Sequence, residues 1–475
     1  MDVHISLVGR RDLAGEIYRQ LRAAIMDGRI REGDALPATR ELAARLSVSR
    51  TTTTVAYDRL VGEGFASARV GSGTYVSHNL RPIPVPQRPP GAALRARRIW
   101  ENVPEPTGMW APVEFDFRPG IPDARLFPYE AWRRLMSRQF RPPAVGRGAY
   151  GDPAGDPGLR EAIVQNIGVS RGVRADPGDV VVTNGTQQAV DLIARVLTAP
   201  GDRVAVEDPG YGPPRRLLAS LGLAVTGVPV DDEGLVVDAI PSQTTLVYVS
   251  PSHQFPLGMS MSLRRRMALL AWANRTGGAI IEDDYDSEFR FGGRPLEPLH
   301  KLDADGRVIY VGSFSKTMLP TLRLGFLVAP PSLHKALVAA KFLADWHSPL
   351  AVQTAMARFI ADGLFARHVR RMRTTYESRH AEITEILTRS FADQLRVVPS
   401  SVGLHLAAVA HEVSVEQMDA IVKRASSGGV ACLPLSMFAA GATARSGLVV
   451  GYGAIADWQI SDGLARLRRC FDAAG

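Results

Sequence analysis

Seven prolines fall between residues 81 and 106, and this stretch constrains the fold more than any other part of the chain. Proline fixes its own φ angle and lacks a backbone N–H, so the stretch is incompatible with a continuous helix or a central strand. At 475 residues the chain is also too long for a single core. We therefore predict three parts: a domain at 10–79, an extended Pro/Arg-rich linker at 80–112 and a large domain at 113–475.

The charge of the chain permits binding to nucleic acid without requiring it. The formal net charge is +8 and the sequence pI is about 9.7. The arginines of the linker fit two roles, contact with DNA phosphates or plain solvation, and solvation is the default for such charges. They are Arg81, Arg88, Arg95, Arg97 and Arg98.

The cysteines and the apolar residues predict a cytoplasmic protein. Cys432 and Cys470 are the two cysteines, too few for a disulfide framework, and they fit a reducing compartment. The first residues lack the apolar core of a signal peptide, and no run of 18 or more apolar residues occurs. We therefore expect no membrane partner.

Residues 12–76 show the order of elements of a winged helix-turn-helix. Apolar residues at helical spacing predict a helix over 12–27, followed by two shorter helices over 39–46 and 49–63. Two short strands, 65–69 and 73–76, then form a ribbon. Two helices joined by a three-residue turn and followed by a β-hairpin are typical of this DNA-binding module.

Several motifs of this segment resemble the GntR-type winged-helix domain, and the resemblance implies DNA binding. They are LPATRELA at 36–43, VSR at 48–50 and GSGTYV at 71–76. A serine at position 49 would cap the recognition helix, whose amide end then faces a phosphate. For the arginines at 40 and 69, a solvated surface is the alternative role. The residues predicted to contact DNA or to shape the wing turn are Arg40, Ser49, Arg50, Thr51, Thr52, Arg69, Gly71 and Gly73.

Two positions depart from the GntR pattern. Ala38 stands where the family usually has serine, so we expect Thr39 to cap the second helix one residue late. Thr53 replaces the usual valine on the inner face of the recognition helix, which leaves a hydroxyl that needs a partner.

Beyond the linker, short apolar runs alternate with helical stretches, which predicts an α/β domain with a mainly parallel sheet. A helical stretch over 356–390 and strands over 404–409 and 447–451 predict a smaller α+β part at the C-terminal end. The predicted strands of the central sheet are 180–183, 204–206, 246–249, 279–282 and 308–311, with helices over 189–197 and 263–273.

Four motifs of the large domain resemble the fold-type I aminotransferases, which use pyridoxal 5′-phosphate (PLP). They are NGTQQ at 184–188, EDPGY at 207–211, EDDY at 282–285 and SFSK at 313–316, and the resemblance covers residues 115–472. It implies a Schiff base between PLP and Lys316, with no metal. Amides at a helix N-terminus are suited to the cofactor phosphate.

The resemblance also implies roles for single residues. Asp283 would pair with the pyridinium nitrogen, and Tyr285 would bind the 3′-oxygen. Tyr211 resembles the aromatic residue that stacks on the ring. Tyr150 resembles the tyrosine that reaches the phosphate of the partner subunit, although a core aromatic needs no such role. His253 fits a role near the 3′-oxygen and a structural role equally well. The other predicted cofactor-binding residues are Gly185, Thr186, Gln187, Ser313, Ser315 and Arg323.

The scarcity of lysine singles out Lys316. The chain has five lysines, all after residue 300, among 56 basic residues. A free lysine amine is mostly protonated at neutral pH. Burial and the positive charge of Arg323 would lower its pKa and free the amine to attack an aldehyde. Pro320 lies between the two residues and favours a loop that brings both side chains to one phosphate.

The combination of a GntR-type domain, a linker and an aminotransferase-like domain resembles the MocR/GabR family of transcriptional regulators. The motifs PSHQFP at 251–256 and EDDYDSEFR at 282–290 carry this resemblance. It implies a DNA-binding homodimer that senses PLP or an amino compound through an aldimine at Lys316, without sustained catalysis. The alternative is an active aminotransferase with an attached DNA-binding domain, and a residual transaminase half-reaction fits either.

Two positions bear on the effector. Pro213 stands where γ-aminobutyrate-sensing members have an arginine, and the segment 446–452 has valine where aminotransferases often have one. Arg215 or Arg445 would have to substitute. One hypothesis is that PLP itself is the signal and that the regulator controls vitamin B6 synthesis. The other retains an amine ligand such as taurine or an amino acid.

Overall fold

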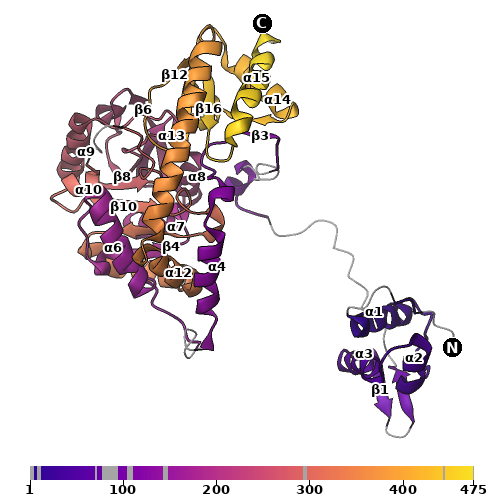
Figure 1. Ribbon diagram of the computed structural model, residues 1–475. Helices are drawn as coiled ribbons and strands as arrows, with labels where there is room; N and C mark the ends of the chain where they lie inside the picture. The colour runs from indigo at the N-terminus through magenta and orange to yellow at the C-terminus, as the bar shows by residue number, and fades with distance from the viewer. Residues whose placement is uncertain are drawn as a thin grey trace. The chain divides into compact units, whose positions relative to one another are not determined.

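The computed structural model describes residues 5–7, 12–69, 72–77, 95–103, 111–142, 148–292, 297–441 and 444–473. The chain forms two compact units, Met1–Arg97 and Arg98–Gly475 (Figure 1). The division between the units falls inside the predicted linker. The seven linker prolines, Arg81 and Arg88 lie outside the described residues, as does Gly71.

The small unit is a winged helix-turn-helix, as predicted. Helices α1 and α2 both pack against α3, and β1 pairs with β2 in an antiparallel ribbon. The core between them is apolar, with Ile17, Leu21 and Leu60 almost without exposed surface. The elements are α1 (Leu13–Met26), α2 (Thr39–Leu46), α3 (Arg50–Gly62), β1 (Ala66–Arg69) and β2 (Gly73–Val76).

The starts of α2 and α3 differ in how they are capped. The Ser49 hydroxyl accepts a hydrogen bond from the Thr52 amide at 3.1 Å, which confirms the predicted cap. The prediction that Thr39 caps α2 is wrong. Ala38 holds the N-cap position without a side-chain bond, because the helix already begins at Thr39. The buried Thr53 hydroxyl lies 2.9 Å from the carbonyl oxygens of Thr39 and Arg50, so it has its partner within the unit.

The large unit is built on an eight-stranded sheet with the order β4-β11-β10-β9-β8-β5-β6-β7. Strands β10, β9, β8, β5 and β6 run parallel to one another, which confirms the prediction of a mainly parallel sheet. Strand β11 runs antiparallel between β10 and β4. The strands are β4 (Val180–Thr183), β5 (Arg203–Asp208), β6 (Ala224–Asp231), β7 (Gly234–Leu235), β8 (Thr244–Val249), β9 (Ala279–Asp284), β10 (Val308–Ser313) and β11 (Gly325–Val328).

Helices cover both faces of this sheet. One apolar cluster joins the sheet to α7 and α11, and others join it to α9 and to the layer of α6 and α12. Strands buried on both faces read as continuous apolar runs, as at 180–182. The helices are α4 (Tyr129–Gln139), α6 (Pro157–Arg171), α7 (Thr186–Leu197), α8 (Gly212–Ser220), α9 (Leu263–Thr276), α10 (Leu299–Leu302), α11 (Pro331–Asp345) and α12 (Leu350–Ala361).

A smaller α+β part follows the long helix α13, shown in orange in Figure 1. The predicted helix over 356–390 is two helices, because Gly363 adopts a left-handed φ of 70° between α12 and α13. Among the described residues, we find no helix with the length and apolarity to span a bilayer. The elements are α13 (Leu364–Ser390), α14 (Val415–Ser427), α15 (Ile460–Asp472), the sheet β12 (Leu395–Val397), β13 (His405–Ala410), β16 (Gly447–Gly451), β15 (Leu433–Pro434), and the pair β3 (Phe115–Asp116) and β14 (Val430–Ala431).

Candidate functional site

The predicted cofactor residues follow the ends of four strands of the central sheet. Strands β5, β9 and β10 run parallel, and β4 has the same direction because two antiparallel pairings separate it from β10. Carboxyl ends of such strands meet at one edge, where ligands of α/β sheets bind. The four motifs of the sequence therefore share this edge.

The amine of Lys316 lies in a polar loop after β10. Its Nζ donates a hydrogen bond to the Gly120 carbonyl oxygen at 2.8 Å. Burial lowers the pKa of Lys316; the carboxylates of Asp286 and Asp283 oppose this shift and Arg323 adds to it. The lowered pKa agrees with the prediction and favours a nucleophilic, neutral amine.

Asp283 at the end of β9 has one carboxylate oxygen without a partner. The Tyr248 hydroxyl donates to Asp283 Oδ2, whereas Oδ1 is buried and has no hydrogen-bond partner among the described residues. Desolvation raises the pKa of Asp283 to about 7, although the Tyr248 bond opposes the rise. A buried orphan oxygen of this kind needs an explanation, and a proton donor on a ligand would supply one.

The buried His253 and the partly buried Tyr285 form a polar group at the end of β9. His253 Nδ1 lies 2.9 Å from Asp286 Oδ1 and 3.0 Å from the Tyr285 hydroxyl, and the two rings stack at 5.7 Å. Burial lowers the pKa of His253 to about 3, so the ring is neutral. Its Nε2 is buried without a partner among the described residues. Both roles predicted for His253 thus stay open, because Asp286 orients the ring while Nε2 is available.

The turn before α7 combines glycine freedom with a guanidinium. Gly185 adopts φ 92°, and a Cβ there would lie 3.0 Å from Arg323 Nη2. Arg323 Nη2 also donates to the Asn184 carbonyl oxygen at 2.6 Å. Thr186 begins α7, so its amide is one of the unpaired N–H groups of the helix start. Gln187 begins the helix with it, and the Ser313 hydroxyl accepts from the Ser315 amide at 3.1 Å.

The two predicted aromatic residues differ in position. Tyr211 precedes α8 and contacts Phe255 edge to face at 5.5 Å, with 37% of its surface exposed. Tyr150 is 75% exposed and lies against Trp346 at 4.2 Å. Because one chain is described, the role of Tyr150 toward a partner subunit stays a prediction.

The predicted DNA-contacting residues lie on the surface of the small unit. Arg50 and Thr51 at the start of α3 are exposed, Thr52 is partly buried and Arg40 on α2 is exposed. Arg69 is exposed on β1, with its guanidinium 5.1 Å from the ring centroid of Tyr75. Gly73 adopts φ 109°, as a wing turn requires, and Ser49 lies at the exposed cap of α3.

Comparison with known proteins gives two family matches. Residues 123–448 match the aminotransferase class I and II family, and residues 13–76 match the bacterial regulatory proteins of the gntR family. Over 462 residues the chain is 36% identical to the probable rhizopine catabolism regulatory protein MocR of Rhizobium meliloti, a match that covers 96% of this chain and 93% of that protein. The chain belongs to the MocR-type transcriptional regulators.

Other relatives agree with this assignment. The pyridoxine biosynthesis transcriptional regulator PdxR of Corynebacterium glutamicum is 32% identical over 92% of this chain and 91% of its own length. The kynurenine aminotransferase of Pyrococcus horikoshii, solved in complex with PMP, has a TM-score of 0.71 and 26% identity over 80% of this chain and 95% of its own. The large domain of this MocR-type regulator therefore has the fold of a PLP-dependent aminotransferase.

The structure adds an acidic anchor that the sequence did not indicate. Asp345 at the end of α11 accepts hydrogen bonds from Asn184 Nδ2 at 2.7 Å and from Gln188 Nε2 at 2.8 Å. Its other oxygen lies 2.5 Å from the Nζ of Lys341, whose side chain has no exposed surface. Lysine is scarce in this chain, so Lys341 inside the apolar helix α11 was the sequence feature that could have pointed to this acidic partner. Asp345, held by Lys341, thus binds Asn184 and Gln188 on either side of Gly185 and fixes this turn.

Arg171 was also missed, because it lies 113 residues from its partner. Its Nε is 2.7 Å from Asp284 Oδ2, and its Nη2 donates to the Ser252 hydroxyl at 2.6 Å. The Tyr310 hydroxyl donates to the same Asp284 oxygen at 2.7 Å. This buried pair neutralises Asp284, the residue next to Asp283, and fixes the end of β9.

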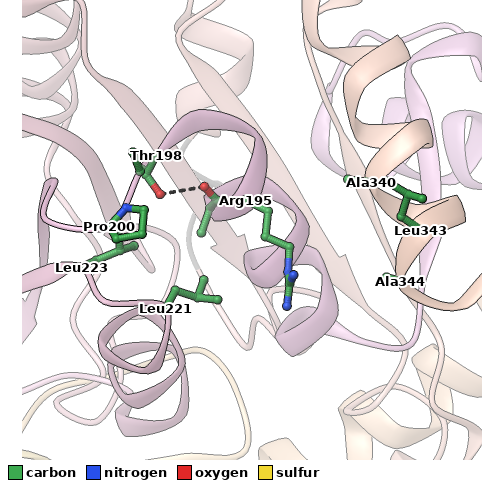
Figure 2. Close-up of a pocket in the computed structure, with 10 residues that line it drawn as sticks. Arg195, Thr198, Pro200, Leu221, Leu223, Ala340, Leu343 and Ala344 are labelled. Atoms are coloured by element: carbon green, nitrogen blue, oxygen red, sulfur yellow. Dashed lines mark hydrogen bonds between the residues drawn. The ribbon is translucent and has the colours of Figure 1, made fainter. Parts of the chain in front are cut away.

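A cavity on another part of the large unit lies away from this site. It has a volume of about 490 Å³ and is bounded by α7, α11 and the loop before β6 (Figure 2). None of the predicted cofactor residues lines it, so its size does not identify the functional site. The chemistry at the strand ends is the better guide. The lining of this cavity includes Arg195, Thr198, Pro200, Leu221, Leu223 and Leu343.

Proposed function

We propose that this MocR-type regulator binds PLP covalently at Lys316 and that cofactor occupancy controls its affinity for DNA. The observation that carries the proposal is the buried Asp283 carboxylate, which has an unpartnered oxygen and a pKa raised to about 7. A protonated ring nitrogen is the kind of donor that this oxygen lacks. The lowered pKa of the Lys316 amine supports the same proposal.

The residues at the site fit the parts of the cofactor. Arg323 and the turn at Gly185 and Thr186 would hold the phosphate, since Gly185 leaves a cradle that a Cβ would narrow. Tyr211 would cover the ring. Tyr285 would contact the 3′-oxygen. When bound, PLP supplies an aldehyde carbon that reacts with amines and a ring that withdraws electrons.

We infer that the regulator acts as a homodimer. Four large apolar side chains, Tyr150, Phe342, Leu343 and Trp346, are exposed by 41% or more, and three of them are joined by ring contacts through Trp346. A second copy of the chain would bury this group. Two small units in a dimer also suit paired DNA half-sites.

We infer that the effector is PLP itself, as in the first of the two hypotheses. Strand β16 has the buried Val449 and Val450 where aminotransferases often have an arginine, so this strand offers no guanidinium to the carboxylate of an amino acid. Arg445 donates to the Val230 carbonyl oxygen at 3.1 Å and is partly engaged. The similarity to a regulator named for pyridoxine biosynthesis supports control of vitamin B6 synthesis. Taurine or an amino acid remains the second candidate.

The protein is expected to bind its own upstream DNA with clearly different affinity in the presence and absence of PLP. A cofactor that binds two conformations unequally shifts the equilibrium by its differential affinity, and a tenfold change in Kd is about 1.4 kcal/mol. Gel-shift titrations of the cofactor-free and PLP-loaded protein measure this. Equal affinities would contradict PLP as the signal, and a response only after addition of taurine or an amino acid would favour an amine effector. Turnover with amino donors and 2-oxoglutarate would instead favour the aminotransferase alternative.

Replacing Asp345 by asparagine is expected to weaken PLP binding by about fivefold to thirtyfold, equivalent to roughly 1–2 kcal/mol for hydrogen bonds that position a ligand group. Asparagine offers fewer acceptor sites to Asn184 and Gln188, so the turn loosens. Pyridoxal, which lacks the phosphate, should bind as before. Fluorescence titration with both compounds separates the two effects.

Two variants control for this experiment. The double variant Lys341→Met with Asp345→Asn removes the buried lysine that would be left unpaired, so a general folding defect should improve while the phosphate-specific loss persists. Asp362→Asn changes an exposed carboxylate after α12 and should leave both titrations unchanged. Equal losses for PLP and pyridoxal would assign Asp345 a merely structural role.

A further inference from the structure

Three packed helices of the large unit carry a cluster of arginines on their exposed sides. Helices α4 and α13 both pack against α12. The Trp132 ring of α4 lies 5.9 Å from Phe359 of α12, and Phe127, just before α4, lies 6.4 Å from His368 of α13. Their buried sides share one apolar core. We define the arginine face as the exposed residues Arg133, Arg134, Arg138, Arg141, Arg358, Arg367, Arg370, Arg371 and Arg373.

The arginine face concentrates positive charge that the rest of the large domain lacks. The segments 129–142 and 350–377 contain these nine arginines and three carboxylates, those of Glu130, Asp362 and Glu377. The remainder of residues 111–475 has 31 basic and 34 acidic residues. A local field of one sign on an otherwise balanced domain attracts a polyanion.

These arginines are also poor in partners. Among the described residues, Arg133 is the one member of the face with an ion pair, to Glu130 at 2.8 Å. Elsewhere on the same unit, arginines such as Arg118, Arg379 and Arg468 hold carboxylates at 3.0 Å or less. An unpaired guanidinium presents its fork of N–H donors, a geometry that matches a phosphate group.

The spacing of the arginines forms stripes on rigid elements. Arg370 and Arg371 lie three and four residues after Arg367 on α13, which places all three on one side of the helix. Between them, His368 points inward, with its Nε2 2.9 Å from the carbonyl oxygen of Thr317, the residue after Lys316. The outward stripe is therefore fixed on a helix that also contacts the lysine loop.

We propose that the arginine face binds the phosphate backbone of double-stranded DNA, as a second DNA contact of the regulator in addition to the winged helix-turn-helix. Phosphate contacts carry no base information, so the face adds affinity and not sequence preference. DNA is the favoured polyanion because the small unit brings it to every operator-bound molecule. The tether through the linker gives the large unit a high effective concentration of DNA.

The test is to remove the stripe on α13 in the full-length protein with Arg367→Ala, Arg370→Ala and Arg371→Ala. Fluorescence anisotropy would measure Kd on a promoter fragment that the protein protects in footprinting, over a series of salt concentrations. We expect Kd to rise about tenfold or more, and the slope of log K against log salt to fall by about 3, roughly 0.9 for each lost phosphate contact. The ratio of operator to unrelated DNA should not change, whereas Arg50→Ala should lower it.

A matched control removes the same charge elsewhere. Arg174, Arg275 and Arg396 are exposed and have no ion pair among the described residues, and their triple alanine variant should keep the wild-type slope. An equal loss of slope in this control would overturn the proposal, because total charge would then explain the effect. An unchanged slope in the α13 variant with a changed oligomeric state would also overturn it and assign the face to a second copy. Should the α13 variant fail to fold, Arg134→Ala, Arg138→Ala and Arg141→Ala on α4 test the same face.

Discussion

Replacing Lys316 by alanine is expected to reduce covalent attachment of PLP to background. Among the five lysines, Lys316 lies in the loop after β10, where burial lowers the pKa of its amine. Borohydride treatment of the PLP-loaded protein followed by peptide mass spectrometry measures the fraction of labelled chains. Lys335→Ala, which removes an exposed lysine of α11, should leave the labelling of Lys316 intact. A label that persists in the Lys316 variant, at another lysine, would contradict the assignment.

The rate of attachment should also show the cause of the lowered pKa. Only the neutral amine attacks an aldehyde, so the rate rises with pH through the pKa of Lys316, at a lower pH than for an ordinary lysine. Arg323 contributes to this lowering. Replacing Arg323 by glutamine should therefore shift the rate profile to higher pH, apart from weakening phosphate binding.

Much of this site was accessible from the sequence, because its components are local. The four motifs follow strand ends, and a strand followed by a glycine-bearing turn can be read from a few adjacent residues. The cap at Ser49 and the wing at Gly73 were predicted for the same reason. The break between α12 and α13 was missed because the apolar pattern continues across Gly363, whose φ of 70° ends the first helix.

The supporting contacts could not be predicted, because they join residues far apart in the chain. Asp345 lies 161 residues from Asn184, and the Gly120 carbonyl that receives the Lys316 amine lies 196 residues from it. Arg171 reaches Asp284 across 113 residues. Sequence periodicity identifies a helix and its buried side, but which distant polar groups meet depends on how the layers pack. A charged residue inside an otherwise apolar helix, such as Lys341, is the signal that remains.

Asp283 links the cofactor proposal to the stability of the free protein. Burial raises its pKa to about 7, so near pH 7 and above the folded protein holds a carboxylate with an unpartnered oxygen. The unfolded chain ionises this group near pH 4. Between about pH 4 and 7 the folded state therefore binds more protons than the unfolded state. The contribution of Asp283 to stability falls as the pH rises through this window, and the loss is complete above it.

Replacing Asp283 by asparagine is therefore expected to act in opposite directions on the free protein and on cofactor binding. The cofactor-free variant should be more stable than the wild type at pH 8, by about 1–3 kcal/mol for removal of an uncompensated buried charge, with a smaller difference near pH 4.5. PLP affinity should fall by about tenfold to a hundredfold, since a charge-assisted hydrogen bond to the ring nitrogen is lost. Thermal unfolding at the two pH values and PLP titration measure both effects.

Glu288 offers a matched control for this trade of stability against binding. Its pKa is raised to about 8 by burial, and its Oε2 is buried without a partner among the described residues, yet it belongs to none of the motifs assigned to PLP. Glu288→Gln should raise the stability of the cofactor-free protein at alkaline pH, as Asp283→Asn does, and leave PLP affinity unchanged. If both variants lost PLP affinity equally, the effect would come from the buried charges of the β9 loop in general. If Asp283→Asn stabilised nothing and bound PLP normally, Asp283 would not be the partner of the ring nitrogen, and the central observation behind the cofactor proposal would fail.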